Sequence, residues 1–104
     1  MTGTSLDGKV AVLTGAGAGL GRAEALALAR AGARVVLNDL PGAAEETAAE
    51  IKALGAEAVV APGDVGERAT ADLIMQTALE SFGSLDIVVN NAGITRDRML
   101  FNMS

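Results

Sequence analysis

Short apolar runs alternate with longer stretches of helical spacing along this chain. Residues 10–14 form an apolar run that ends on a threonine. Residues 34–38, 56–61 and 85–89 form similar short, mainly apolar runs. A run without a polar face is typical of a strand that is covered on both sides, as in a parallel sheet. The alternation of such runs with helical stretches therefore predicts an α/β fold of about four parallel strands joined by crossover helices.

Glycines that can end a helix support the prediction of helices between these strands. A stretch of helical spacing that is followed by glycine is typical of a helix that ends in a left-handed cap. Three stretches have this form. They are residues 20–31, which precede Gly32, residues 42–54, which precede Gly55, and residues 67–81, which are separated from Gly83 only by Phe82. A fourth helix is expected to begin within residues 97–104.

Composition and charge narrow the class of protein. The chain has 104 residues, which allows one domain at most, and aromatic residues make up only 2% of it. Its net charge of −5 and its scattered basic residues argue against a nucleic-acid partner. Cysteine and histidine are absent, so no metal site is predicted. There is no basic leader and no apolar run of about 20 residues, so we expect a cytoplasmic protein without a membrane segment.

A glycine-rich loop connects the first strand to the first helix. Its sequence TGAGAGLG has the spacing Gly-x-x-x-Gly-x-Gly at Gly15, Gly19 and Gly21. Such glycines permit a tight turn, the close approach of a pyrophosphate and close contact between helix and sheet. The amides of the first helical turn, with Ala18 and Leu20 beside them, would face the phosphates. A flexible turn without a ligand is the alternative interpretation of this loop.

An acidic residue stands at the end of the second predicted strand. Asp39 follows the glycine loop by eighteen residues, close to the roughly 20 expected for the carboxylate that binds the adenosine ribose. That carboxylate would repel the 2′-phosphate of NADP, and Ala18, Asn38 and Leu40 are not basic. We therefore predict NAD as the cofactor, in preference to NADP. The alternative is that Asp39 caps the turn before Pro41.

Two further motifs follow the third and fourth predicted strands. Asp64 and Val65 come after the third strand, at the edge of the sheet where open α/β folds bind ligands. They could hold the adenine amino group and ring face, although Gly-Asp is also an ordinary turn and cap sequence. The fourth strand ends in Asn90, Asn91, Ala92 and Gly93. The two carboxamides could bond neighbouring strands while the small residues leave room for a ligand, and a simple turn is the alternative.

These four motifs in register resemble the short-chain dehydrogenase/reductase family from about residue 6 to the end of the chain. The resemblance implies a Rossmann-type, doubly wound parallel sheet, of which this chain is the N-terminal half. It assigns the glycine loop to the pyrophosphate of NAD, Asp39 to the adenosine ribose, and Asp64 with Val65 to the adenine. It assigns residues 90–93 to the central region of the cofactor and to stabilisation of the strands.

A narrower resemblance comes from residues 94–100, which are similar to a segment of 3-oxoacyl-carrier-protein reductases and of multifunctional-enzyme-type hydroxyacyl-CoA dehydrogenases. The pair Asn38-Asp39 is more similar to the second group. The resemblance implies an NAD-dependent oxidoreductase that interconverts a secondary alcohol and a ketone, with a 3-hydroxyacyl or 3-oxoacyl thioester as candidate substrate. It also implies a homo-oligomer, commonly a tetramer.

The catalytic groups of this family do not occur in the chain. The family uses a serine, a Tyr-x-x-x-Lys pair and an asparagine, all expected beyond Ser104, and the chain contains no tyrosine. Residues 1–104 are therefore predicted to be an incomplete NAD-binding domain without a catalytic residue. The alternative from another class is a non-catalytic NAD-binding module or a truncated regulator.

Overall fold

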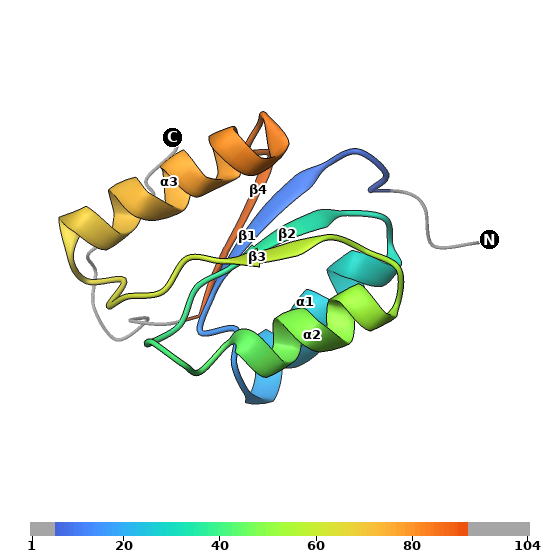
Figure 1. The fold of residues 1–104 in the computed structure, drawn as a ribbon, viewed down its shortest axis with the longest axis horizontal. Coiled ribbons are helices and arrows are strands. Elements are labelled where there is room, and N and C mark those ends of the chain that lie inside the picture. Colours follow the sequence, from blue (N-terminus) through green and yellow to red (C-terminus); the bar gives the residue numbers. More distant parts are fainter. Residues whose placement is uncertain (1–5, 92–104) are drawn as a thin grey trace.

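A four-stranded parallel sheet in the order β3-β2-β1-β4 forms the centre of the molecule. The structure is a computed structural model and describes residues 6–91. Figure 1 shows α1 and α2 together on one face of the sheet and α3 on the other. The elements in chain order are β1 (Val10–Thr14), α1 (Gly19–Arg30), β2 (Arg34–Leu37), α2 (Glu45–Ala53), β3 (Ala58–Val60), α3 (Arg68–Phe82) and β4 (Ile87–Asn90).

The side chains of β1 alternate between the two faces of the sheet. Ala11 and Leu13 belong to the core cluster under α1 and α2, whereas Val10 and Val12 belong to the cluster under α3. All residues of β1 are buried, as the apolar run predicts for a strand covered on both sides. This one strand therefore contributes side chains to the core on each face of the sheet.

Small side chains let the helices lie close to the sheet. The buried positions of α1 are Gly21, Ala25 and Ala29, which leave little bulk between helix and strands. On the other face, α3 buries Ile74 and Ala78 against the sheet. This packing explains how a core with almost no aromatic side chains can be filled.

The second helix begins later than the sequence predicts. It starts at Glu45 rather than at residue 42, because Gly42 has a φ of +87°, which a right-handed helix does not accommodate. The backbone turns before the helix, with the amide of Ala43 donating to the carbonyl of Leu40 at 3.0 Å. The turn brings residues 40–44 beside the glycine loop.

The order of the strands reverses at β1. The chain proceeds from β1 to β2 and β3 on one side, and then crosses back through α3 to place β4 on the other side of β1. A crevice forms at the carboxyl ends of two strands where the connections leave in opposite directions. The predicted fold class, an α/β parallel sheet of Rossmann type, is confirmed. Within residues 6–91, no helix has the length and apolar content needed to cross a membrane.

The core beneath α3 supplies a test of this packing. Ile74 is fully buried, whereas Leu79 on the same helix is 52% exposed. We expect Ile74→Ala to lower the free energy of unfolding by about 2–5 kcal/mol, since it leaves a cavity. Leu79→Ala should change it by no more than about 0.5 kcal/mol. Urea denaturation of both variants measures the difference, and equal losses would contradict the packing described here.

Candidate functional site

The three glycines of the predicted motif meet different demands in the loop between β1 and α1. Gly15 and Gly19 have φ values of +64° and +59°, in the left-handed region that residues with a Cβ disfavour. Gly21 lies in the first turn of α1, and a Cβ there would overlap the carbonyl oxygen of Gly15. The loop therefore needs two glycines for its turns and a third for the close contact of α1 with the strand end.

The amino end of α1 lacks a side-chain cap at its N-cap residue. The N-cap residue is Ala18, which makes no side-chain cap hydrogen bond, and the first turn contains no acidic residue. The space where a Cβ of Gly19 would lie contains no described atom within 4 Å. A helix end without a side-chain cap or an acidic first turn, with the positive end of the helix dipole, suits an anion at this position.

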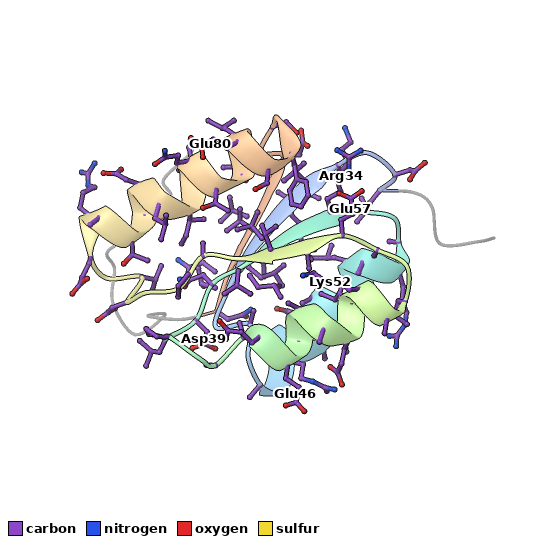
Figure 2. The ribbon with its side chains drawn as sticks, viewed as in Figure 1. Arg34, Asp39, Glu46, Lys52, Glu57 and Glu80 are labelled. Carbon is purple, nitrogen blue, oxygen red and sulfur yellow. The ribbon has the colours of Figure 1, made fainter. Side chains whose placement is uncertain are left out.

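The carboxylate of Asp39 is held against the glycine loop. Its Oδ2 accepts a hydrogen bond from the amide of Gly17 at 2.9 Å, and its Oδ1 accepts one from the amide of Leu40 at 2.8 Å. Each carboxylate oxygen can accept more than one hydrogen bond, so both retain capacity for a ligand hydroxyl. Figure 2 shows Asp39 at the opposite end of the sheet from Arg34 and Glu57.

Gly17 is a residue that the sequence interpretation left out of the site. A Cβ at Gly17 would overlap the carbonyl oxygen of Ala43 and would lie 2.9 Å from Oδ2 of Asp39. Its lack of a side chain therefore permits both the packing on residues 40–44 and the bond to Asp39. The signal in the sequence was a fourth glycine within the loop, at a position where the motif accepts any residue.

Thr14 joins the carboxyl ends of β1 and β4. Its hydroxyl donates to Oδ1 of Asn90 and accepts from the amide of Asn91, both at 2.8 Å. The carboxamide nitrogen of Asn91 donates to Oε1 of Glu24 on α1 at 2.7 Å, and more weakly to the carbonyl of Thr14 at 3.4 Å. The two carboxamides therefore link the ends of β1 and β4 to each other and to α1, mainly through side chains, and the carboxamide of Asn91 also bonds a strand backbone at the carbonyl of Thr14. Ala92 and Gly93 lie outside the described residues.

Asn38 and Asp39 connect β2 to the segment that follows β3. The buried carboxamide of Asn38 donates to the carbonyls of Ala61 and Gly63 at 2.9 and 3.2 Å. The amide of Gly63 in turn donates to the carbonyl of Asp39 at 2.9 Å. These bonds bring the residues after β3 to the same edge of the sheet as the glycine loop.

Asp64 and Val65 follow directly on that segment. Oδ1 of Asp64 accepts a hydrogen bond from the amide of Gly66 at 2.8 Å, so one carboxylate oxygen stabilises the turn before α3. Val65 is half-buried against the core cluster under α3. Asp64 therefore stabilises a turn, which is the alternative that the sequence left open. Its side chain is also exposed at the carboxyl edge of the sheet.

A cation follows the glycine loop but is already paired. Arg22 on α1 forms an ion pair and hydrogen bond with Glu50 on α2. The hydrogen bond to Glu50 and then the Coulombic attraction of Glu50 raise the pKa of Arg22; desolvation opposes them, and Glu46 adds the smallest contribution to the rise. The guanidinium therefore stays charged and directed toward the carboxylates of α2.

The opposite, amino edge of the sheet has a separate depression of about 480 Å³. Its lining has both signs of charge, from Asp7 and Glu57 and from Arg30 and Arg34. It contains none of the residues predicted to bind the cofactor. Among residues 6–91, no group of three or more histidine, cysteine, aspartate or glutamate side chains is placed to hold a metal ion.

The carboxyl edge of the sheet thus brings the described members of all four motifs together. It offers helix amides for an anion, a carboxylate beside the loop for hydroxyl groups, and a second, exposed carboxylate after β3.

The chain is similar to known dehydrogenases along most of its length. The sequence model of the short-chain dehydrogenases matches residues 9–104. The hydroxyacyl-CoA dehydrogenase ChsB1 of Mycobacterium tuberculosis is 60% identical over 107 residues, which cover 97% of this chain and 33% of that protein. Peroxisomal multifunctional enzyme type 2 of Drosophila melanogaster is 48% identical over 108 residues, covering 94% of this chain and 18% of that protein.

A solved structure supports the same relationship. The crystal structure of a hydroxysteroid dehydrogenase from Escherichia coli superposes with a TM-score of 0.82 at 40% sequence identity, and covers 88% of this chain and 39% of that one. The chain thus spans about a third of the length of the mycobacterial dehydrogenase and about two fifths of that of the Escherichia coli dehydrogenase. Since the family model matches most of its length, the chain belongs to the short-chain dehydrogenase family of oxidoreductases.

Proposed function

We propose that this chain binds NAD at the carboxyl edge of its sheet, as the cofactor-binding part of an oxidoreductase that interconverts a secondary alcohol and a ketone. The observation that carries the proposal is the hydrogen bond between Gly17 of the loop and Asp39. It places a carboxylate suited to ribose hydroxyls directly beside a loop suited to a pyrophosphate. NAD, when bound, supplies the hydride acceptor for alcohol oxidation, and NADH the hydride donor for the reverse reaction.

The glycine loop would hold the pyrophosphate through backbone groups. The lack of a side-chain cap at Ala18 and the open space beside Gly19 support this assignment. A residue with a Cβ at position 19 would need the same left-handed backbone and would project into the space that a phosphate needs. Ala18 and Leu20, both exposed on either side of Gly19, would flank the bound phosphates.

Asp39 would select NAD over NADP. Its oxygens can accept hydrogen bonds from the two hydroxyls of the adenosine ribose, whereas a 2′-phosphate would bring negative charge against the carboxylate. Arg22 is paired with Glu50 and so is not arranged to offset that repulsion. The charge balance at this end of the site therefore favours the unphosphorylated ribose.

The other motif residues would contact the remaining parts of NAD. Asp64 and Val65, at the edge next to Asp39, would bind the adenine amino group and ring face. Asn90 and Asn91, at the strand end next to the loop, would line the central region of the cofactor together with Ala92 and Gly93. The network around Thr14 supports this role because it holds the two strand ends together at the reversal point.

The proposed substrate class is a 3-hydroxyacyl or 3-oxoacyl thioester. The relatives named above include a hydroxyacyl-CoA dehydrogenase and a peroxisomal multifunctional enzyme. We assign no catalytic residue among the 104, which contain no tyrosine to act as the proton donor or acceptor used in this family. We further propose that residues 1–104 form the NAD-binding part of one Rossmann domain in a cytoplasmic homo-oligomer.

Cofactor titration of the full protein tests the assignment of Asp39. We expect NAD to bind more tightly than NADP, and Asp39→Ala to weaken NAD binding about tenfold or more, since it removes hydrogen bonds to a charged acceptor. The same variant should narrow the gap between NAD and NADP. Isothermal titration calorimetry measures all four dissociation constants. Tighter binding of NADP by the unmodified protein would overturn the assignment.

Two alanine variants separate binding of the pyrophosphate from general stability. Gly21→Ala should abolish measurable NAD binding, because its Cβ overlaps the carbonyl of Gly15 and must displace the loop. Gly55→Ala is the matched control, since its φ is +90° but its Cβ would meet no described atom within 4 Å. That control should lower the free energy of unfolding by about 1–2 kcal/mol through backbone strain and leave the dissociation constant of NAD unchanged. Normal NAD binding by folded Gly21→Ala protein would contradict the loop assignment.

The substrate class has its own assay. The full protein with NAD and a 3-hydroxyacyl-CoA should produce NADH, measured by absorbance, while the corresponding acyl-CoA without the hydroxyl gives none. NAD binding without turnover of any hydroxyacyl thioester would support the non-catalytic module instead.

A further inference from the structure

A buried hydroxyl on α2 reaches back to the glycine loop. Oγ1 of Thr47 donates a hydrogen bond to the carbonyl oxygen of Ala16 at 3.0 Å. Thr47 and Ala16 are both fully buried, so this bond lies out of contact with water. Thr47 lies outside the four motifs that predict the cofactor site, and Ala16 occupies a position of the glycine loop at which the motif accepts any residue.

The bond from Thr47 acts on the same peptide unit that contacts Asp39. The carbonyl of Ala16 and the amide of Gly17 belong to one peptide group, whose amide donates to Oδ2 of Asp39 at 2.9 Å. In a trans peptide these two groups point in opposite directions within one plane. Thr47 therefore holds the carbonyl end of a unit whose amide end holds Asp39.

This arrangement determines which way the peptide unit faces. Rotation of the unit would break the bond to Thr47 and turn a carbonyl oxygen toward the carboxylate of Asp39, which is unfavourable for two acceptors. A hydrogen bond to the carbonyl also polarises the peptide group and strengthens its amide as a donor. The amide of Ala16 is fixed in addition, since it donates to the carbonyl of Asn38 at 3.0 Å.

We propose that Thr47 is a positioning residue for cofactor selection, which acts through the Ala16–Gly17 peptide to keep the carboxylate of Asp39 in the orientation that accepts the adenosine ribose. This inference rests on the proposed NAD site. Because the contacts exist within the chain itself, the carboxylate is held in place before a cofactor arrives. Such preorganisation spares the ligand the cost of ordering the side chain.

Threonine variants in the full protein test the proposal by calorimetric titration of NAD and NADP. Thr47→Val keeps the shape of the side chain and removes the donor, so NAD binding should weaken about five- to tenfold, in line with the loss of one buried hydrogen bond. NADP binding should change less than NAD binding. Thr47→Ser retains a hydroxyl and should bind NAD within about twofold of the unmodified protein.

Two controls distinguish positioning from general structural damage. Thr77→Val makes the same change on α3, across the sheet, and should leave both dissociation constants unchanged. In an Asp39→Ala background, which removes the acceptor of the Gly17 amide, Thr47→Val should cost less than about twofold in NAD affinity, because residues that act through one another are not additive. Thr47→Ala, which removes the hydroxyl without placing a methyl group against the carbonyl, replaces Thr47→Val if that variant does not fold.

Each outcome decides the matter. Unchanged NAD affinity in the folded variants that lack the hydroxyl would overturn the proposal, as would equal losses for NAD and NADP or full additivity with Asp39→Ala. Failure of the unmodified protein to bind NAD would instead overturn the proposed function, and is seen before any variant is made.

Discussion

The parallel pairing of β1 with a neighbour on each side is the constraint on which the rest of this structure depends. β1 pairs with β2 through Val10 to Leu13 and with β4 through Ala11 to Thr14. Because both neighbours run parallel to it, three carboxyl strand ends meet at one edge of the sheet. The glycine loop, Asp39 and the Asn90-Asn91 pair each follow directly from one of those ends, which is why motifs far apart in the sequence converge.

Hydrogen bonds of backbone groups hold the glycine loop in place at that edge. The loop is held by its own carbonyls and amides, through Thr47, Asn38 and Asp39, rather than by packing of large side chains. Buried backbone groups need partners, and here each partner also defines the direction of a peptide group. The loop can therefore consist of small residues throughout, because hydrogen bonds to the surrounding elements fix the position of its backbone.

The strand and helix order could be predicted from the sequence because each element leaves a local signal. Unbroken apolar runs indicated the strands of a sheet covered on both faces, and glycines such as Gly83 marked helix ends; Gly83 has the left-handed conformation expected of a cap. The start of α2 could not be predicted so well. The sequence predicts that the helix begins at residue 42, but the positive φ of Gly42 and the turn in which Ala43 donates to the carbonyl of Leu40 come first, and the helix begins at Glu45.

The sequence by itself thus determined the fold class, the family and the four motifs, since these depend on periodicity, on glycine spacing and on residues next to strand ends. Only the tertiary structure decided that Gly17 holds Asp39, that Arg22 is paired with Glu50, and that Thr47 supports the loop. Those contacts join residues 22 to 31 positions apart, on different elements. Their partners are chosen by how α1, α2 and β2 pack together, which no local pattern in the chain records.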